Sequence, residues 1–397
     1  MAAVAIEMAS PVTPSRAKKL PRLCHFTALH TELKSRSYYM QFMPLAAGGT
    51  KVRYVSPAGI RGRHHRVDFV ALPKRRGWLR HFLAIPSLLN VLRKQRAGLY
   101  HFQDLELLPT ALLLKLLLRK RVVFDCYEDF PSMALTMRNT PPLLRPVAAS
   151  IVAAAVRLAA HTFDGLMTAD PLTLRKMARS GRCHKITFYN FPNLDVFPPP
   201  AADPAKDFDI VYRGGLSERA GTWVLLDAMR LVTLRGLAAR LLLIGYCDDA
   251  KVEAALRERI RGLGLSAHVE LMKRIPHDKM AQTLSRARIG ISPLQDIPKF
   301  RINIPVKVFE YWACGLPVIA SDLPPIRPFF KNVNGGLLFQ PAAASALAHS
   351  IGWMLEHPEI SARMGQNGRD AVVHRFNHHR ELQKLRRFFA LIAADVH

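Results

Sequence analysis

Short segments with strand-like patterns, several of them apolar runs bounded by charge, recur through the first half of the chain. They are Leu23–Ala28, Lys51–Ser56, Val67–Leu72, Leu99–Phe102 and Arg121–Phe124. Helical spacing marks Ser35–Ala47, which ends at two glycines, and Leu79–Arg96, and a Leu-rich helical run precedes the last strand. Arg61–Arg66 is expected to be a basic loop. This strand–helix–strand rhythm predicts a doubly wound parallel sheet.

The same rhythm restarts after Phe197–Ala205, a segment with four prolines that predicts a linker. The expected strands are Phe208–Tyr212, Ala239–Ile244, His268–Leu271, Ile289–Ser292 and Pro317–Ala320. The expected helices are Ala220–Thr233, Asp249–Gly262 and His277–Ala287, with more over most of Ala342–Ile392. At 397 residues the chain is long enough for two domains. Two α/β halves predict a ligand cleft between them, at the carboxyl ends of the strands.

Charge is the unusual feature of the composition. The chain has 57 Lys and Arg against 30 Asp and Glu, a net charge of +27. Residues 1–200 hold 30 basic and 11 acidic side chains, or +19, so the first half is the electropositive one. Such a charge favours a nucleic acid, an anionic membrane or a phosphorylated small molecule, or it is simply a solvated basic surface. Without a recognisable nucleic-acid module, no nucleic acid is expected as a partner.

Cysteine spacing and hydropathy indicate the compartment. The five scattered cysteines form no Cys-x-x-Cys pair, which argues against zinc and disulfides and fits a reducing, cytoplasmic setting. No stretch reaches the ~18 uncharged apolar residues of a membrane span. Arg61–Arg66, Lys74–Arg76 and Arg93–Arg96, with Trp78, Phe82 and Leu83, could rest on the inner face of the plasma membrane, or the same residues could cover the N-terminal core.

The most informative window runs from Asn303 to Ser321. Pro305 suits the first position of a helix that ends near Gly315. The start of a helix binds anions, and Lys307 adds a cation there. Glu310, in the same helix, could accept hydrogen bonds from two vicinal hydroxyls. Alternatively, Lys307 and Glu310 form a surface pair at i, i+3.

This window resembles the retaining glycosyltransferases of family 4, which have the GT-B fold. The matching motif runs from Pro305 to Ser321, and is followed by Gly335-Gly336, Pro341 and Met364–Arg369. Tyr212–Gly221 is similar to the glycine loop of the family. His101–Pro109 and Phe124–Pro131 are similar to motifs of bacterial cell-surface polysaccharide members.

The resemblance implies two Rossmann-like doubly wound domains facing a central cleft, with C-terminal helices packing back toward the N-terminal domain. The implied boundaries are a disordered tail at 1–21, an acceptor-binding domain at 22–196, a linker at 197–206, a nucleotide-sugar-binding domain at 207–375 and a crossing helix at 376–397. It also implies that Glu310 holds the ribose of the donor, and that Lys307 and the helix start hold its diphosphate. The implied donor-binding residues are Gly214, Gly215, Arg274, Asn303, Pro305, Lys307 and Glu310.

Four positions depart from the family pattern. Ile302 stands where a second Glu usually contacts the transferred sugar, and Tyr127 replaces a His. Gly215 and Ala220 stand where the glycine loop usually offers Arg and Lys to the diphosphate. Loss of those two cations would raise the barrier by a few kcal/mol. Lys307, Arg213 and Arg219 are therefore the candidate catalytic residues, because either arginine could compensate.

Acceptor-binding candidates cluster after strands of the first half. They are His30, Asp104, Glu106, Tyr127 and Glu128. The carboxylates of Asp125 and Asp129 lie in the same segments and are plausible acceptor ligands too. The alternatives are that the carboxylates, with Asp125 and Asp129, cap helices or solvate loops, that His30 is structural and that Tyr127 is a packed aromatic. No Asp-x-Asp metal signature stands out beside these motifs, so we expect neither a metal nor a cofactor besides the nucleotide sugar.

The function implied is transfer of a hexose, with retention of configuration, from a nucleoside-diphosphate donor to a glycan or lipid-linked acceptor during cell-surface polysaccharide synthesis. The donor base is uridine or guanosine. Two alternatives share the fold: a catalytically silent partner of another transferase, and a nucleotide-sugar epimerase that transfers nothing.

Overall fold

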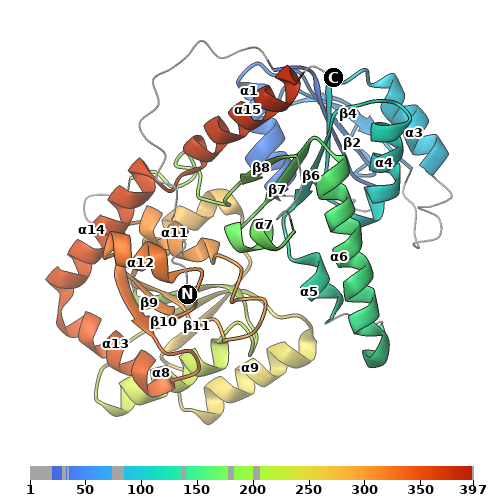
Figure 1. The fold of residues 1–397 in the computed structure, drawn as a ribbon. Helices are drawn as coiled ribbons and strands as arrows, with labels where there is room; N and C mark the ends of the chain where they lie inside the picture. Colours follow the sequence, from blue (N-terminus) through green and yellow to red (C-terminus); the bar gives the residue numbers. More distant parts are fainter. Residues whose placement is uncertain are drawn as a thin grey trace. The chain divides into compact units, whose positions relative to one another are not determined.

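The computed structural model describes residues 20–28, 33, 35–73, 85–135, 140–177, 183–199 and 206–395. The chain forms two compact units, each built around its own sheet (Figure 1). We call Ala9–Asn190 with His379–His397 the N-terminal unit, and Phe191–His378 the C-terminal unit. Residues 1–19 of the expected tail and 200–205 of the expected linker lie outside the described residues.

The N-terminal unit is built on an eight-stranded sheet in the order β3-β4-β2-β1-β5-β6-β7-β8. Its strands are β1 Leu23–Phe26, β2 Val52–Ser56, β3 Gly62–His64, β4 Val67–Ala71, β5 Leu99–Phe102, β6 Val122–Cys126, β7 Gly165–Thr168 and β8 His184–Thr187. Every pairing is parallel except that of β3 with β4. All five predicted strands are present. The chain order reverses between β1 and β5, which makes their carboxyl ends the switch point of this sheet.

The expected basic loop at Arg61–Arg66 was wrong in part, because it contains strand β3. This strand pairs antiparallel with β4 through a turn in which His65 and Arg66 have φ values of 48° and 64°. All three residues of β3 are exposed. A short edge strand without buried side chains leaves no hydrophobic period in the sequence, so its pattern could not reveal it.

Helices cover both faces of the N-terminal sheet. They are η1 Ser35–Phe42 (a π-helix), α1 Met43–Ala47, α3 Ile85–Lys94, η2 Leu105–Leu107, α4 Leu108–Leu116, α5 Phe130–Ala134, η3 Pro142–Leu144, α6 Arg145–Thr162, α7 Pro171–Met177 and α15 His378–Ala394. Buried residues of α3, α4 and α6 pack in one core cluster, and those of η1, α1 and α15 in the other. The C-terminal helix α15 therefore completes the N-terminal unit, as expected. The first part of the predicted helix Leu79–Arg96 lies outside the described residues.

The C-terminal unit is built on a six-stranded parallel sheet in the order β11-β10-β9-β12-β13-β14. Its strands are β9 Phe208–Gly215, β10 Leu241–Tyr246, β11 Val269–Lys273, β12 Ala287–Ser292, β13 Val318–Ser321 and β14 Gly336–Phe339. Its helices are α8 Thr222–Leu234, α9 Ala250–Gly262, η4 His277–Lys279, α10 Met280–Leu284, α11 Val306–Ala313, α12 Arg327–Val333, α13 Ala344–Glu356 and α14 Pro358–His374. This is the strand order of the dinucleotide-binding fold, and its switch point lies between β9 and β12.

Candidate functional site

The carboxyl edge of the C-terminal sheet gathers most of the predicted donor-binding residues. Strand β9 ends in Arg213, Gly214 and Gly215 beside the switch point. Helix α11 is anchored to that strand end, because the backbone N–H of Arg213 donates to Tyr311 Oη at 2.8 Å. This hydrogen bond holds the strand end against the helix that carries Lys307 and Glu310.

Helix α11 begins one residue later than predicted. Pro305 is its N-cap, with φ −74° and ψ 104°, and not its first helical residue. The fixed φ of proline is compatible with a helix, but the extended ψ makes Val306 the first residue with helical geometry. The helix ends as predicted, since Cys314 is its C-cap and Gly315 has a φ of 71°.

Glu310 is a buried carboxylate, only 3% exposed. Its Oε2 lies 3.1 Å from Nε of Arg213, the ion pair that the structure gives it. That oxygen nevertheless has no directed hydrogen bond from any described residue. The alternative of a surface pair with Lys307 is therefore wrong. A buried carboxylate with unused acceptor capacity is costly unless a ligand supplies donors.

Lys307 lies beside this ion pair. Its Nζ is 4.2 Å from the centroid of the Tyr212 ring, a cation–π contact. Burial, assisted by the nearby charge of Arg213, lowers the pKa of its ammonium to about 7, and Glu310 opposes this shift. The charge of Arg213 balances that of the Glu310 carboxylate, and a protonated Lys307 adds a positive charge that suits an anionic ligand.

Gly214 lets the backbone approach this cluster. Its φ is 149°, and a Cβ placed on it would lie 3.0 Å from Nζ of Lys307 and 3.1 Å from Oη of Tyr212. A side chain here would crowd both groups, and it would require a positive φ that side chains rarely adopt. Gly215 differs, because a Cβ on it would meet no atom within 4 Å.

A cavity of about 320 Å³ opens beside these residues. Arg213, Gly214 and Arg274 line it, so the structure brings three predicted residues together. Tyr246 and His277 also line it, and the sequence analysis missed both. Tyr246 is the last residue of β10, so its position at a strand end next to the glycine loop was the available signal.

The predicted catalytic residue Arg219 and two predicted donor-binding residues do not line the cavity. Arg219 pairs with Asp248 at 3.3 Å, and its side chain is 64% exposed. Asn303 is half-buried, and its backbone N–H donates to the carbonyl of Lys299. Pro305 lines a small void with Ser292 and Ser321, whose buried hydroxyls have no hydrogen-bond partner among the described residues.

The acceptor candidates of the N-terminal unit separate into buried and accessible groups. Asp104 is 4% exposed, and its Oδ2 accepts a 2.5 Å hydrogen bond from Thr27 across the switch point. Glu106 is exposed, whereas Tyr127 and Glu128 are half-buried. The Tyr127 ring packs edge-on against Phe130, as its alternative as a packed aromatic predicts. His30 lies outside the described residues.

Asp125 and Asp129 have structural partners. Arg36 donates to both carboxylate oxygens of Asp125 at 2.9 Å, and this arginine was not anticipated. Although burial opposes it, Arg36 and then His101 hold the pKa of Asp125 far below its usual range. Asp129 caps α5 by accepting from the backbone N–H of Ser132, as the capping alternative predicts.

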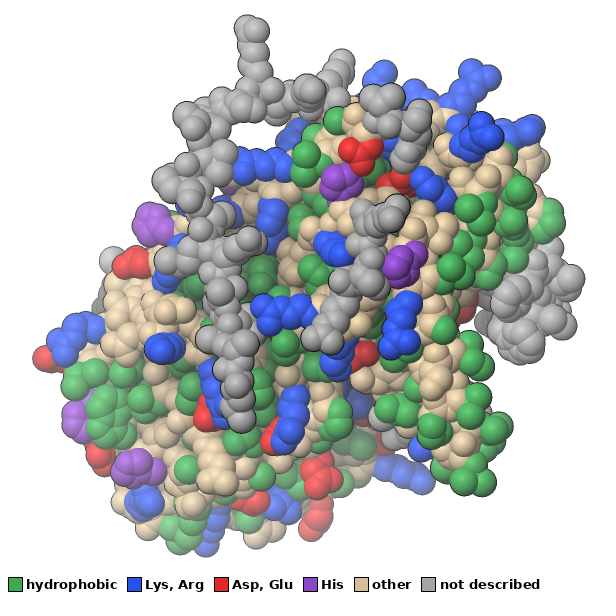
Figure 2. Space-filling view, viewed as in Figure 1, with side chains coloured by type: hydrophobic (Ala, Val, Ile, Leu, Met, Phe, Trp, Pro, Cys, Tyr) green, Lys and Arg blue, Asp and Glu red, His purple; other side chains and the backbone are tan. Residues whose placement is uncertain are grey.

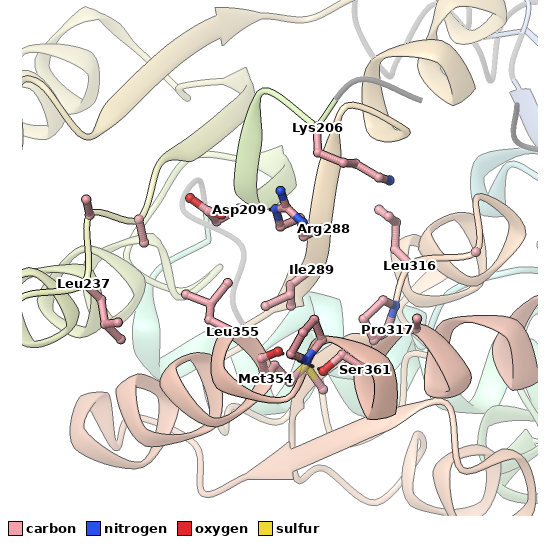
Figure 3. Close-up of a pocket in the computed structure, with 15 residues that line it drawn as sticks. Lys206, Asp209, Leu237, Arg288, Ile289, Leu316, Pro317, Met354, Leu355 and Ser361 are labelled. Carbon is pink, nitrogen blue, oxygen red and sulfur yellow. Dashed lines mark hydrogen bonds and ion pairs between the residues drawn. The ribbon is translucent and has the colours of Figure 1, made fainter. Parts of the chain in front are cut away.

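A larger cavity, of about 530 Å³, lies at the opposite edge of the C-terminal sheet (Figure 3). Its charged side chains are already paired: Arg288 with Asp209 at 3.4 Å, and Lys206 with two backbone carbonyls. Asp209 also belongs to an Asp-x-Asp sequence, but Asp207 pairs with Arg286 at 2.6 Å. We therefore take the carboxyl edge as the candidate functional site. Among the described residues no group of three His, Cys, Asp or Glu could hold a metal.

Comparison with known sequences finds a family model that matches most of the C-terminal unit. Residues 197–371 match the model for glycosyl transferases group 1. The chain is 26% identical over 184 residues to a phosphatidyl-myo-inositol mannosyltransferase of Mycobacterium leprae, covering 46% of each. It is 31% identical over 134 residues to an amylovoran biosynthesis glycosyltransferase of Erwinia amylovora, covering 34% of this chain and 32% of that one. The chain thus spans half or less of the length of these curated relatives.

Solved structures extend the likeness to almost the whole chain. Sucrose-phosphate synthase from Thermosynechococcus elongatus aligns with a TM-score of 0.73 at 19% identity, covering 94% of this chain and all of that one. HepE from Anabaena in complex with UDP-glucose aligns with a TM-score of 0.72 at 13% identity, with the same coverage. At these identities the likeness shows the fold alone, which is GT-B.

Proposed function

We propose that this chain, whose C-terminal unit matches the group 1 glycosyl transferases, moves a sugar from a nucleoside-diphosphate donor to a glycan or lipid-linked acceptor. The donor binds at the carboxyl edge of the C-terminal sheet, and the N-terminal unit binds the acceptor. The transfer retains the anomeric configuration and serves the synthesis of a cell-surface polysaccharide in the cytoplasm. Relatives whose names refer to amylovoran and colanic acid biosynthesis support this acceptor class.

The observation that carries the proposal is the buried Glu310 carboxylate with an unused acceptor at the switch point of a dinucleotide-type sheet. Vicinal hydroxyls of a ribose would supply two donors to such a group. Lys307 and Arg213 stand next to it with positive charge. This combination matches a nucleoside diphosphate, which is a diol joined to a polyanion. HepE, on the same fold, has been solved with UDP-glucose.

The chemistry requires little covalent participation by protein groups. The leaving nucleoside diphosphate gains negative charge as the glycosidic bond breaks, so fixed cations and N–H groups near it lower the barrier. Lys307, Arg213 and the first N–H groups of α11 fill this role. Because Arg219 is turned to Asp248, we assign the compensating charge to Arg213.

The test is turnover of a panel of UDP- and GDP-sugars, with release of the nucleoside diphosphate as the readout. We expect at least one donor to be used, and Glu310→Gln to lower kcat/KM at least tenfold. Glu270→Gln is the matched control, because its carboxylate is 48% exposed on β11. Nucleotide binding without turnover would favour the silent partner, since Gly215 and Ala220 lack the usual cations. Conversion of the donor into an isomer would favour the epimerase.

A further inference from the structure

Helix α6 presents an apolar face to solvent. Val147 is 55% exposed and Ile151 is 64% exposed. Leu158, about two helical turns after Ile151, is 52% exposed. The short turn η3 before the helix adds Leu143 and Leu144, at 91% and 55%. We call these five residues the α6 face. Their spacing of three, four and seven residues places Leu144, Val147, Ile151 and Leu158 on one side of the helix.

This face is unusual because the opposite side of the helix is also apolar. Val156, Ala159 and Ala160 are buried in the core of the N-terminal unit. A surface helix normally turns polar side chains outward. Pro142–Thr162 is instead long and apolar enough to cross a membrane by length and composition, with only 17% of the most apolar window buried. The outer side of α6 is therefore built for an apolar contact that the N-terminal unit does not supply.

Neighbouring elements enlarge the apolar surface. Helix α5 packs on α6 and exposes Met133 by 42%, with Leu135 just after it exposed by 46%. Helix α4 also packs on α6, and at its end Leu116 and Leu117 are 64% and 70% exposed. In Figure 2, green apolar side chains gather on the part of the N-terminal unit where Figure 1 draws α5 and α6. Exposed apolar patches of this kind mark interaction sites.

Charge decides between the possible occupants. Helix α6 contains Arg145 and Arg157 and no acidic residue, and residues 1–200 carry +19. A second copy would bring two such positive surfaces together, which Coulomb repulsion disfavours. An anionic lipid surface offers apolar chains to the leucines and negative headgroups to the arginines.

We propose that the α6 face docks the N-terminal unit on an anionic lipid surface by inserting into the boundary between headgroups and acyl chains. The helix lies on the surface and does not span it, because Val156, Ala159 and Ala160 stay in the protein core. This contact differs from the segments singled out in the sequence, which lie between Arg61 and Arg96, because it is formed by η3 and α6. It needs no nucleotide, so it holds or fails independently of the proposed transfer.

The experiment is cosedimentation of the full chain with vesicles of phosphatidylglycerol and phosphatidylcholine in equal parts, and with phosphatidylcholine alone. We expect binding to the anionic vesicles that weakens as salt is added. Val147→Asp/Ile151→Asp weakens binding at least tenfold, because burying each side chain in lipid changes the binding constant by roughly tenfold or more. Leu234→Asp is the matched control, because Leu234 is 63% exposed but lies on α8 of the C-terminal unit. We expect this variant to bind the anionic vesicles as tightly as wild type.

A second readout does not depend on introduced charge. The tryptophan emission of Ile151→Trp shifts to the blue on anionic vesicles, whereas that of Leu234→Trp stays as in buffer. The proposal is overturned if wild type does not bind the anionic vesicles, or if the aspartate pair binds as tightly as wild type. It is also overturned if wild type is a dimer that the aspartate pair dissociates, because the occupant is then a second copy.

Discussion

Replacing Lys307 by methionine is expected to stabilise the protein while weakening its proposed ligand binding. Burial lowers the pKa of the Lys307 ammonium to about 7, from an ordinary value of 10.5. Between these two pH values the unfolded chain holds a proton that the folded chain has released. The stability of the wild type therefore rises as the pH increases from about 7 to 10.5. Below about pH 7 the buried Lys307 ammonium destabilises the folded state by the full amount.

The size of the effect follows from that pKa shift. Each unit corresponds to 1.36 kcal/mol, so the whole shift sets an upper bound on the order of 5 kcal/mol. Part of the side chain remains in contact with water, which reduces the penalty, and we expect about 1–3 kcal/mol. Methionine keeps an unbranched stem of similar length against the Tyr212 ring and removes only the charge. The increase in the free energy of unfolding of Lys307→Met over wild type should be present near pH 6.5 and nearly absent near pH 10.

The assay is urea unfolding of wild type and Lys307→Met at these two pH values. Lys251→Met, an exposed position on α9, controls for the loss of a surface charge. The variant should also bind UDP or GDP at least tenfold more weakly, since it lacks the proposed diphosphate cation. The reasoning is refuted if Lys307→Met is less stable than wild type near pH 6.5, or if its gain is the same at both pH values.

Three further outcomes follow from the site and the N-terminal core. Arg213→Ala should weaken nucleotide binding at least tenfold by calorimetry. Arg219→Ala should change the affinity by less than threefold, because Arg219 belongs to an exposed ion pair. Equal effects would contradict the assignment of the diphosphate-binding charge to Arg213. Gly215→Arg should strengthen nucleotide binding severalfold, because its Cβ has open space and a cation is restored beside the ligand; unchanged affinity would mean that this loop does not face the diphosphate. Asp125→Asn should lower the free energy of unfolding by about 3–5 kcal/mol in urea, because it leaves the Arg36 charge buried without its partner. A loss below about 1 kcal/mol would show that the pair contributes little.

The sheet strands were predictable because parallel strands buried on both faces are short apolar runs. Leu99–Phe102 and the strand beginning at Val122 are entirely buried, and both carry this signature. Gly62–His64 has no buried residue and escaped detection. The helix end at Gly315 was predictable from its glycine, whereas the helix start depends on the ψ of Pro305, which proline does not fix.

The candidate site was predictable by position but not by contact. The sequence showed that Gly214 follows a strand and that Lys307 lies at the start of a helix. It did not show which residue pairs with Glu310. The spacing of residues in α11 suggested Lys307 as the ion-pair partner of Glu310. In the folded unit that partner is Arg213, which comes from β9. Asp125 was also read as a residue near a ligand, but Arg36, 89 positions away, buries it in an ion pair. Such long-range pairings leave no periodic signal in a single sequence.

The outer face of α6 shows the same limit. The run Ile151–Ala160 is apolar in the sequence whether its outer side is covered or not. Only the packed unit shows that Val156 is buried and Ile151 exposed.

The most direct test of the account is calorimetric titration of the full chain with UDP and with GDP, for wild type and for Glu310→Ala. We expect micromolar binding of one of the two nucleotides, weakened at least tenfold by the substitution, because the ribose hydroxyls lose their acceptor. Binding of neither nucleotide, or equal binding by the variant, would contradict the claim that Glu310 and the carboxyl edge of the C-terminal sheet hold a nucleoside-diphosphate donor.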